Sequence, residues 1–132
     1  MNKEIANKWT AALRSGDYPQ GAGALCGGKS FCCVGVLVEQ FRIEFPGIIQ
    51  RIDGEVEKNT AVYRINHGDR TTNHTDILPD IVSTWAGMFS AVGVFNEALD
   101  YDRLNYGLIS LNDDGLPFNQ IADLIDNFSE LL

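Results

Sequence analysis

The sequence predicts an α+β fold: a single compact domain of about four or five helices packed on a small, mostly antiparallel sheet, spanning residues 1–132. Two observations predict it. Apolar residues recur at helical spacing near both ends of the chain, and the middle is rich in strand-forming residues separated by turn signals. The composition, 45% hydrophobic and 21% charged, is that of a globular protein and excludes wholesale disorder.

Each predicted helix shows apolar residues three or four positions apart. In the first helix, Ile5, Trp9 and Leu13 fall on one face. The last helix has the clearest apolar stripe, and Pro117 suits its first turn. In the third helix, the residues expected to point inward are Ile81, Val82 and Trp85. We expect helices at residues 5–13, 34–45, 79–86, 100–111 and 117–128.

The central part of the chain carries the β-type signals. We expect strands at residues 48–52 and 61–66, with a weaker candidate at 55–58. Asp53-Gly54 is a turn dipeptide, which predicts a turn after the first of these strands. The stretch HGDRTTNHTD is predicted to be a polar loop, and residues 88–98 fit a strand and a helix equally well.

Charge is unevenly distributed along a chain whose net charge is −8. Residues 1–70 carry nine basic and eight acidic side chains, whereas residues 71–132 carry ten acidic ones and only Arg103. An acidic half repels nucleic acids and membrane surfaces and attracts basic protein surfaces, so we do not expect direct binding of nucleic acid. The alternative interpretation is that the charge serves solubility alone.

The sequence also indicates a soluble, cytosolic protein without membrane attachment. No apolar stretch approaches the roughly 20 residues needed to span a bilayer, and the amino terminus shows no apolar signal core. The three cysteines are an odd number, and the adjacent Cys32 and Cys33 could pair with each other only under strain. We therefore expect reduced thiols.

Four stretches together resemble a group of small proteins encoded by bacteriophages and prophages. They are KWTAALRSGDYPQGAGAL, FCCVGVLVEQF, LPDIVSTWAGM and LISLNDDGLPFNQIADLID, and they cover about half of the chain. The resemblance implies a phage accessory protein that acts in the cytoplasm of a bacterial host. Such proteins often antagonise host systems, including defence, by stoichiometric binding.

The cysteines at the start of the second helix are the candidate catalytic residues. A thiolate at a helix N-terminus is stabilised by free amides and by the helix dipole. The stretch from Cys33 to Val38 is similar to the helix opening of NlpC/P60-type cysteine peptidases, in which the cysteine is the nucleophile and a downstream histidine is the base. This resemblance implies Cys33 (or Cys32) as nucleophile and His67 or His74 as base.

A different interpretation of the two cysteines is that they are small buried residues at a helix crossing, because free cysteine is among the most buried residue types. A metal site is not expected. The cysteine and histidine spacings match no common zinc pattern, and the two histidines lie seven residues apart in a predicted loop.

The glycine-rich loop before the second helix is a candidate anion site. Residues 23–30 match the letters of a phosphate-binding P-loop, but no buried strand precedes them, so nucleotide hydrolysis is not expected. Binding of a small anionic molecule, such as a nucleotide signal, without turnover is compatible with the loop. The candidate ligand-binding residues are Arg14, Gln20, Gly21, Gly23, Lys29 and Ser30.

The interpretation favoured by the sequence is a non-enzymatic, phage-type accessory protein without a cofactor. It would bind either a host protein with a basic surface or a small anionic ligand. The alternatives are a cysteine-dependent hydrolase and a structural or assembly protein of the virion.

Overall fold

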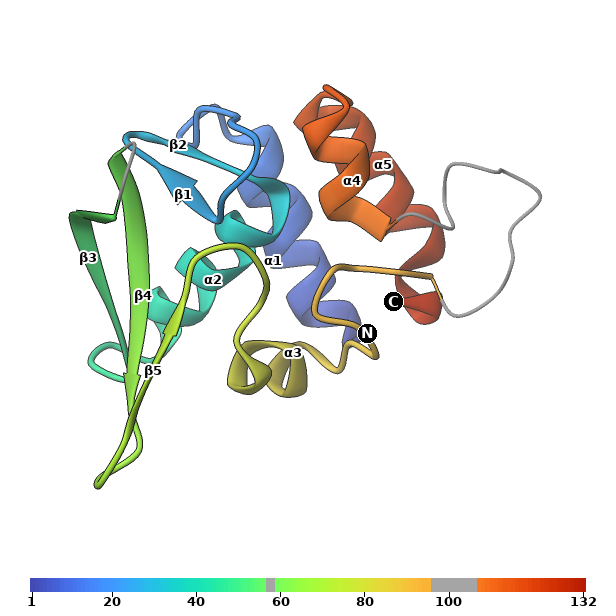
Figure 1. Cartoon of the computed structure of the whole chain (residues 1–132). Helices are drawn as coiled ribbons and strands as arrows, with labels where there is room; N and C mark the ends of the chain where they lie inside the picture. The colour runs from blue at the N-terminus through green and yellow to red at the C-terminus, as the bar shows by residue number, and fades with distance from the viewer. Residues whose placement is uncertain (57–58, 96–106) are drawn as a thin grey trace.

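A computed structural model describes residues 1–56, 59–95 and 107–132, and it confirms the α+β fold (Figure 1). The helices are α1 (Lys3–Arg14), α2 (Cys33–Glu44), α3 (Asp80–Ala86), α4 (Gly107–Asp113) and α5 (Phe118–Phe128), which is followed by the 3-10 helix η3 (Ser129–Leu131). The strands are β1 (Cys26–Gly27), β2 (Ser30–Phe31), β3 (Ile49–Val56), β4 (Thr60–Asn66) and β5 (Thr71–His74).

The strand β4 organises the sheet, because β1, β3 and β5 all pair with it, each in antiparallel orientation. The short strand β2 extends the sheet by pairing with β1. Ile65 lies opposite Ile49 of β3, and Tyr63 lies opposite His74 of β5. Tyr63 and Ile65 are buried on the same face of β4, so this face of the sheet is turned toward the core.

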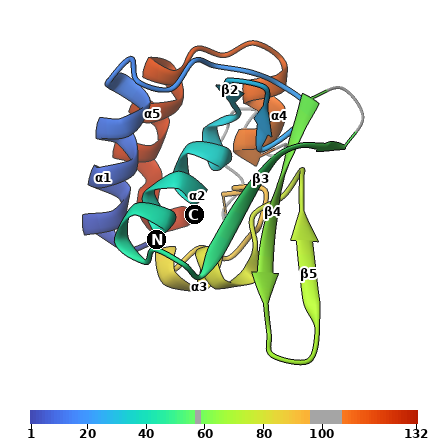
Figure 2. The same cartoon turned by 90° about the vertical axis from the view of Figure 1, so that its left-hand side faces the viewer.

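The helix α2 lies at the centre of the molecule, between the sheet and the pair formed by α1 and α5 (Figure 2). Its residues from Cys33 to Val38 are all buried, as expected for a helical segment that is apolar on every side. The indole nitrogen of Trp9 on α1 donates to the carbonyl oxygen of Cys33 at 2.8 Å, and Trp9 has no exposed surface. The ends of the chain meet, since the Met1 ammonium group donates to the Leu132 carbonyl oxygen at 3.2 Å.

Gly35 allows the chain before β1 to cross α2 at close range. A Cβ atom at this position would overlap the carbonyl oxygen and carbon of Leu25. The Leu25 backbone is held in place, because its amide donates to the Thr75 carbonyl oxygen at 2.7 Å. Only glycine therefore fits at this position, although glycine is usually unfavourable inside a helix.

The described helices confirm most of the sequence prediction. α1, α2, α3 and α5 lie where apolar spacing placed them, and α4 forms the end of the predicted 100–111 helix. Residues 100–106 of that prediction lie outside the described residues. Of the ambiguous segment 88–98, residues 88–95 form neither a helix nor a strand, and the rest also lies outside the described part. Among the described helices, none has the length and apolarity needed to cross a bilayer.

Three local predictions are wrong. Asp53-Gly54 does not end a strand but lies inside β3, where the register shifts between Ile52 and Val56 and Gly54 adopts a positive φ of 79°. This is the geometry of a bulge. Residues 71–74 of the predicted polar loop form β5, because β4 offers them an edge to pair with. Ile81 is exposed rather than turned inward, whereas Val82 is buried.

Replacing Gly35 with alanine should destabilise the protein by about 1–3 kcal/mol or prevent folding, because the new methyl group must displace the Leu25 backbone. Urea unfolding measures the change. Gly27→Ala is the matched control, since a Cβ there meets nothing within 4 Å. Equal stability of the two variants would contradict the close-approach role of Gly35.

Candidate functional site

The two adjacent cysteines lie at the N-terminus of α2, as predicted, but both thiols are buried. Cys32 is the N-cap, and its sulfur accepts from the Gly35 amide at 3.3 Å. The Cys33 sulfur donates to the Leu108 carbonyl oxygen at 3.4 Å. Burial raises the pKa of Cys32 to about 11 and raises the pKa of Cys33 well above its usual value. Removal from water therefore outweighs the helix N-terminus, and both groups stay protonated near neutral pH.

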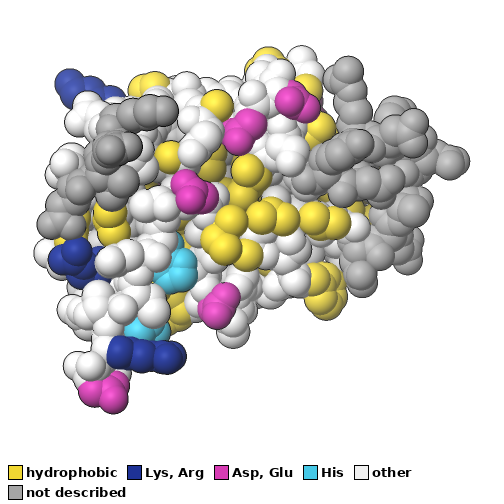
Figure 3. All heavy atoms as spheres, in the orientation of Figure 1, with side chains coloured by type: hydrophobic (Ala, Val, Ile, Leu, Met, Phe, Trp, Pro, Cys, Tyr) yellow, Lys and Arg dark blue, Asp and Glu magenta, His cyan; other side chains and the backbone are white. Residues whose placement is uncertain are grey.

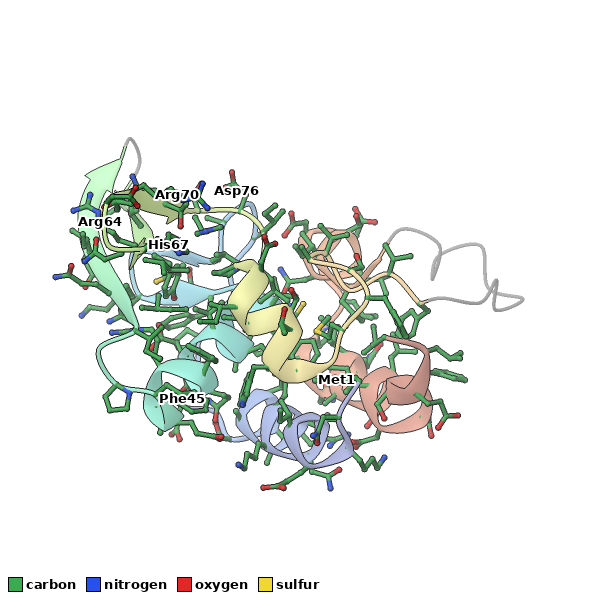
Figure 4. All side chains as sticks on the ribbon, turned by 90° about the horizontal axis from the view of Figure 1, so that it is seen from below. Met1, Phe45, Arg64, His67, Arg70 and Asp76 are labelled. Carbon is green, nitrogen blue, oxygen red and sulfur yellow. The ribbon has the colours of Figure 1, made fainter. Side chains whose placement is uncertain are left out.

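The candidate bases do not contact these thiols. His67 follows β4, and its Nε2 lies 2.9 Å from the Thr72 hydroxyl oxygen. Figure 4 shows His67 near Arg64 and Arg70 on the β4–β5 hairpin. His74 lies on β5, where burial lowers its pKa and Asp80 partly opposes this effect. Cys33 instead contacts α1 and α4, so the structure does not bring it together with either histidine.

The amides of the glycine-rich loop are used inside the protein. Gly21 donates to the Phe31 carbonyl oxygen at 2.8 Å, and Gly28 donates to the Asn59 carbonyl oxygen at 2.7 Å. The Gly23 amide donates to a carboxylate oxygen of Asp113 at 3.1 Å. A loop that already holds a carboxylate with its amides offers an anionic ligand few free donors and a repulsive neighbour.

The other candidate ligand-binding residues either have partners within the protein or are not close to one another. Arg14 bridges Asp123 and Asp126 of α5 at 2.6 and 2.8 Å. The Ser30 hydroxyl donates to the Gly27 carbonyl oxygen at 2.9 Å, and Lys29 is exposed. The structure therefore does not gather these side chains with Gln20 into one anion site. Among the described residues, no group of three His, Cys, Asp or Glu side chains is arranged to hold a metal ion.

A buried carboxamide that the sequence analysis overlooked organises this region. Asn112 on α4 is 2% exposed, and its Oδ1 accepts from the Cys33 amide and from Gln20 Nε2, both at 3.1 Å. Its Nδ2 donates to the Gly21 carbonyl oxygen at 2.8 Å. Asn112 follows Leu108 at i+4, so a polar residue on the buried stripe of a helix was the signal that could have revealed it.

Gln20 is a second connecting residue. Its Oε1 accepts from the Phe118 amide at the start of α5 at 3.0 Å, and its Nε2 also donates to the Leu116 carbonyl oxygen at 2.7 Å. Gln20 thus caps α5, which has no side-chain cap of its own. Through Gln20 and Asn112, the glycine-rich loop, the start of α2 and the α4–α5 turn form one hydrogen-bonded unit.

A buried ionic cluster joins α2 to the sheet. The Tyr63 hydroxyl donates to Glu39 Oε1 at 2.8 Å, Arg42 contacts the same carboxylate at 2.7 Å, and Arg51 does so at 3.2 Å. The carboxylate is thus satisfied by three donors. Burial raises the pKa of Tyr63, with the Glu39 charge as a second cause, so Tyr63 remains a donor. The cluster is a structural clamp rather than a reactive site.

Two neighbouring segments carry exposed apolar side chains. Phe89 is 72% exposed and Ile77 is 48% exposed, and Ile81 at the start of α3 is also exposed. The segments that carry Ile77 and Phe89 run side by side, because the Leu78 amide donates to the Ala91 carbonyl oxygen. Figure 3 shows hydrophobic side chains across the middle of one face of the protein with acidic side chains around them.

Exposed acidic residues directly precede two of these apolar residues in the chain. Asp76 precedes Ile77, Asp80 precedes Ile81, and all four are exposed. We call Asp76, Ile77, Asp80, Ile81 and Phe89 the acid-framed face. An apolar centre with a charged rim is the usual composition of a protein-binding surface, and the sign of this rim suits a basic partner.

A family model described as "Domain of unknown function (DUF8296)" matches residues 1–129. The chain belongs to this family. No curated protein and no solved structure matches the chain. The acid-framed face, the buried thiols and the Asn112 network all lie within the span that the family model covers.

Replacing Asn112 with alanine should lower the free energy of unfolding by about 2–4 kcal/mol, because the Cys33 amide and the Gly21 carbonyl would be buried without partners. Urea unfolding measures the loss. Asn119→Ala, at an exposed position of α5, is the control and should change little. Equal stabilities would show that Asn112 does not connect these segments.

In the folded protein, Cys32 and Cys33 should resist iodoacetamide near neutral pH and should react once guanidinium chloride unfolds the chain. The reason is that both thiols are buried and protonated. Mass spectrometry of the digested protein locates the modified cysteines. Rapid, selective alkylation of either one in the native protein would favour the hydrolase alternative.

Proposed function

We propose that this protein is a non-catalytic, phage-type accessory protein that binds a host protein with a basic surface and blocks it by occupancy. The acid-framed face carries the proposal. Its apolar side chains provide area that a partner can bury, and Asp76 and Asp80 provide a rim that attracts positive charge. The setting of the proposal is the cytoplasm of a bacterial host, and it rests on the resemblance to phage and prophage proteins.

Two further features support binding rather than catalysis. The candidate nucleophiles are protonated, and their sulfur atoms contact the Gly35 amide and the Leu108 carbonyl oxygen rather than an imidazole, so activation of a thiol has no geometric support. The amides of the glycine-rich loop donate to acceptors within the protein, so they are not free to bind a small anion. This favours a protein partner. His74 borders the face from β5, and its lowered pKa keeps it neutral near pH 7, so it adds no positive charge there.

The test is native mass spectrometry of the tagged protein recovered from infected bacteria. The wild-type protein should retain one basic host protein at equal stoichiometry, with retention weaker at about 300 mM salt than at about 50 mM. Phe89→Ser should weaken binding by about tenfold or more, because an exposed aromatic residue is the best anchor on the face. Asp76→Lys combined with Asp80→Lys should also weaken it.

Ile43→Ser is the matched control. Ile43 is 69% exposed but lies on α2, beside Lys8 and Tyr18 rather than on the acid-framed face. This variant should retain the partner. The proposal is wrong if the Phe89 and Asp76/Asp80 variants retain the partner as well as the wild type does, or if a small molecule or metal is retained in its place. Assembly into large homo-oligomers without a host protein would favour the virion alternative.

A further inference from the structure

A groove along α5 forms a second surface, separate from the acid-framed face. It encloses about 590 Å³, which is within the range of pockets that hold ligands or side-chain anchors. The apolar residues that line it are Leu111, Leu116, Pro117, Leu124 and Phe128. We call it the α4–α5 groove.

The spacing of its lining residues shows that the groove runs along α5. Gln120, Leu124 and Phe128 follow one another at i, i+4 and i+8, so they form one stripe along α5. Eight residues of helix correspond to about 12 Å, or somewhat more than two turns. Phe128 is held at one end by an edge-to-face contact with Phe95, whose ring centroid lies 6.2 Å away. The stripe is therefore a preformed surface parallel to a helix.

The charged residues that line the groove are acidic. Asp114 and Asp123 line it, and none of its described lining residues is basic. The segment 107–132 adds the carboxylates of Asp113, Asp126 and Glu130 and contains no Lys, Arg or His. Arg14 offsets part of this charge by pairing with Asp123 and Asp126, but Asp114 is exposed and forms no ion pair with another described residue.

We infer that the α4–α5 groove binds an amphipathic helix of another protein, with large apolar residues on one face and Lys or Arg on the flanks. The leucines and Phe128 of the groove receive apolar anchors at i and i+4, and Asp114 and Asp123 contact the basic flanks. This is the helix-in-groove mode of recognition. The inference does not depend on the acid-framed face, because it uses different residues of the protein.

A designed fluorescent peptide of about five helical turns tests it, with leucines along one face and lysines elsewhere. It should bind the full-length protein in a fluorescence anisotropy titration and perturb the amide chemical shifts of α4 and α5. A peptide with every lysine replaced by glutamate, and one with the same composition in scrambled order, should not bind. Binding should weaken as salt rises, since the flanking charges are exposed.

Variants on both surfaces make the assignment specific. Leu124→Asn should weaken peptide binding by about tenfold, and Asp114→Asn by about two- to fivefold with a smaller salt dependence. Phe89→Ser, on the acid-framed face, should leave peptide affinity unchanged. Circular dichroism melting checks that each variant is folded, and Asp114→Asn changes only an exposed side chain.

Three results would overturn the inference: equal binding of the lysine and glutamate peptides, unchanged affinity in the folded Leu124 and Asp114 variants, or shifts confined to residues 76–89. A concentration-dependent dimer that excludes the peptide would assign the groove to a second copy of the chain, and it would also overturn the inference. None of these results depends on whether the acid-framed face binds a host protein.

Discussion

The carboxamide of Asn112 is the contact on which the arrangement of this protein depends. It satisfies the Cys33 amide, which the N-terminus of α2 would otherwise leave without a partner, and it holds the Gly21 carbonyl oxygen. Gln20 extends the connection to the first amide of α5. The chain near residues 20, 33 and 112–118 is thus joined around Asn112, and the burial of Asn112 and Cys33 makes an unpaired polar group there costly.

The sequence predicted the helices well because apolar periodicity is a local property and each helix buries the stripe that the spacing defines. It failed where structure depends on a distant partner. Residues 71–74 look like a polar loop on their own, and they are a strand only because β4 pairs with them. Gly54 looks like a turn residue, yet the long pairing of β3 with β4 continues past it and converts the turn into a bulge.

The candidate site was harder to predict, because chemical role depends on burial and on neighbours. Cys33 lies at a helix N-terminus, as the spacing indicated, but desolvation raises its pKa far more than the helix end lowers it. Gln20 was predicted as a ligand-binding residue, but its partners in the structure are Asn112 and backbone groups of the α4–α5 turn. The residues of the acid-framed face come from three segments of the chain. The sequence indicated the acidic charge of this half of the protein but not which residues would form the face.

The turn between α4 and α5 connects the buried network to both proposed binding surfaces. Asp113 points back to the Gly23 amide and holds the loop whose Leu25 supports the segment before α3. The next residue, Asp114, lines the α4–α5 groove instead. Of these two neighbouring carboxylates, one therefore holds the glycine-rich loop and the other lines the groove. Because Gln20 and Asn112 hold that turn from inside, the same hydrogen bonds that join the glycine-rich loop to α4 and α5 also set the position of Asp114 on the groove.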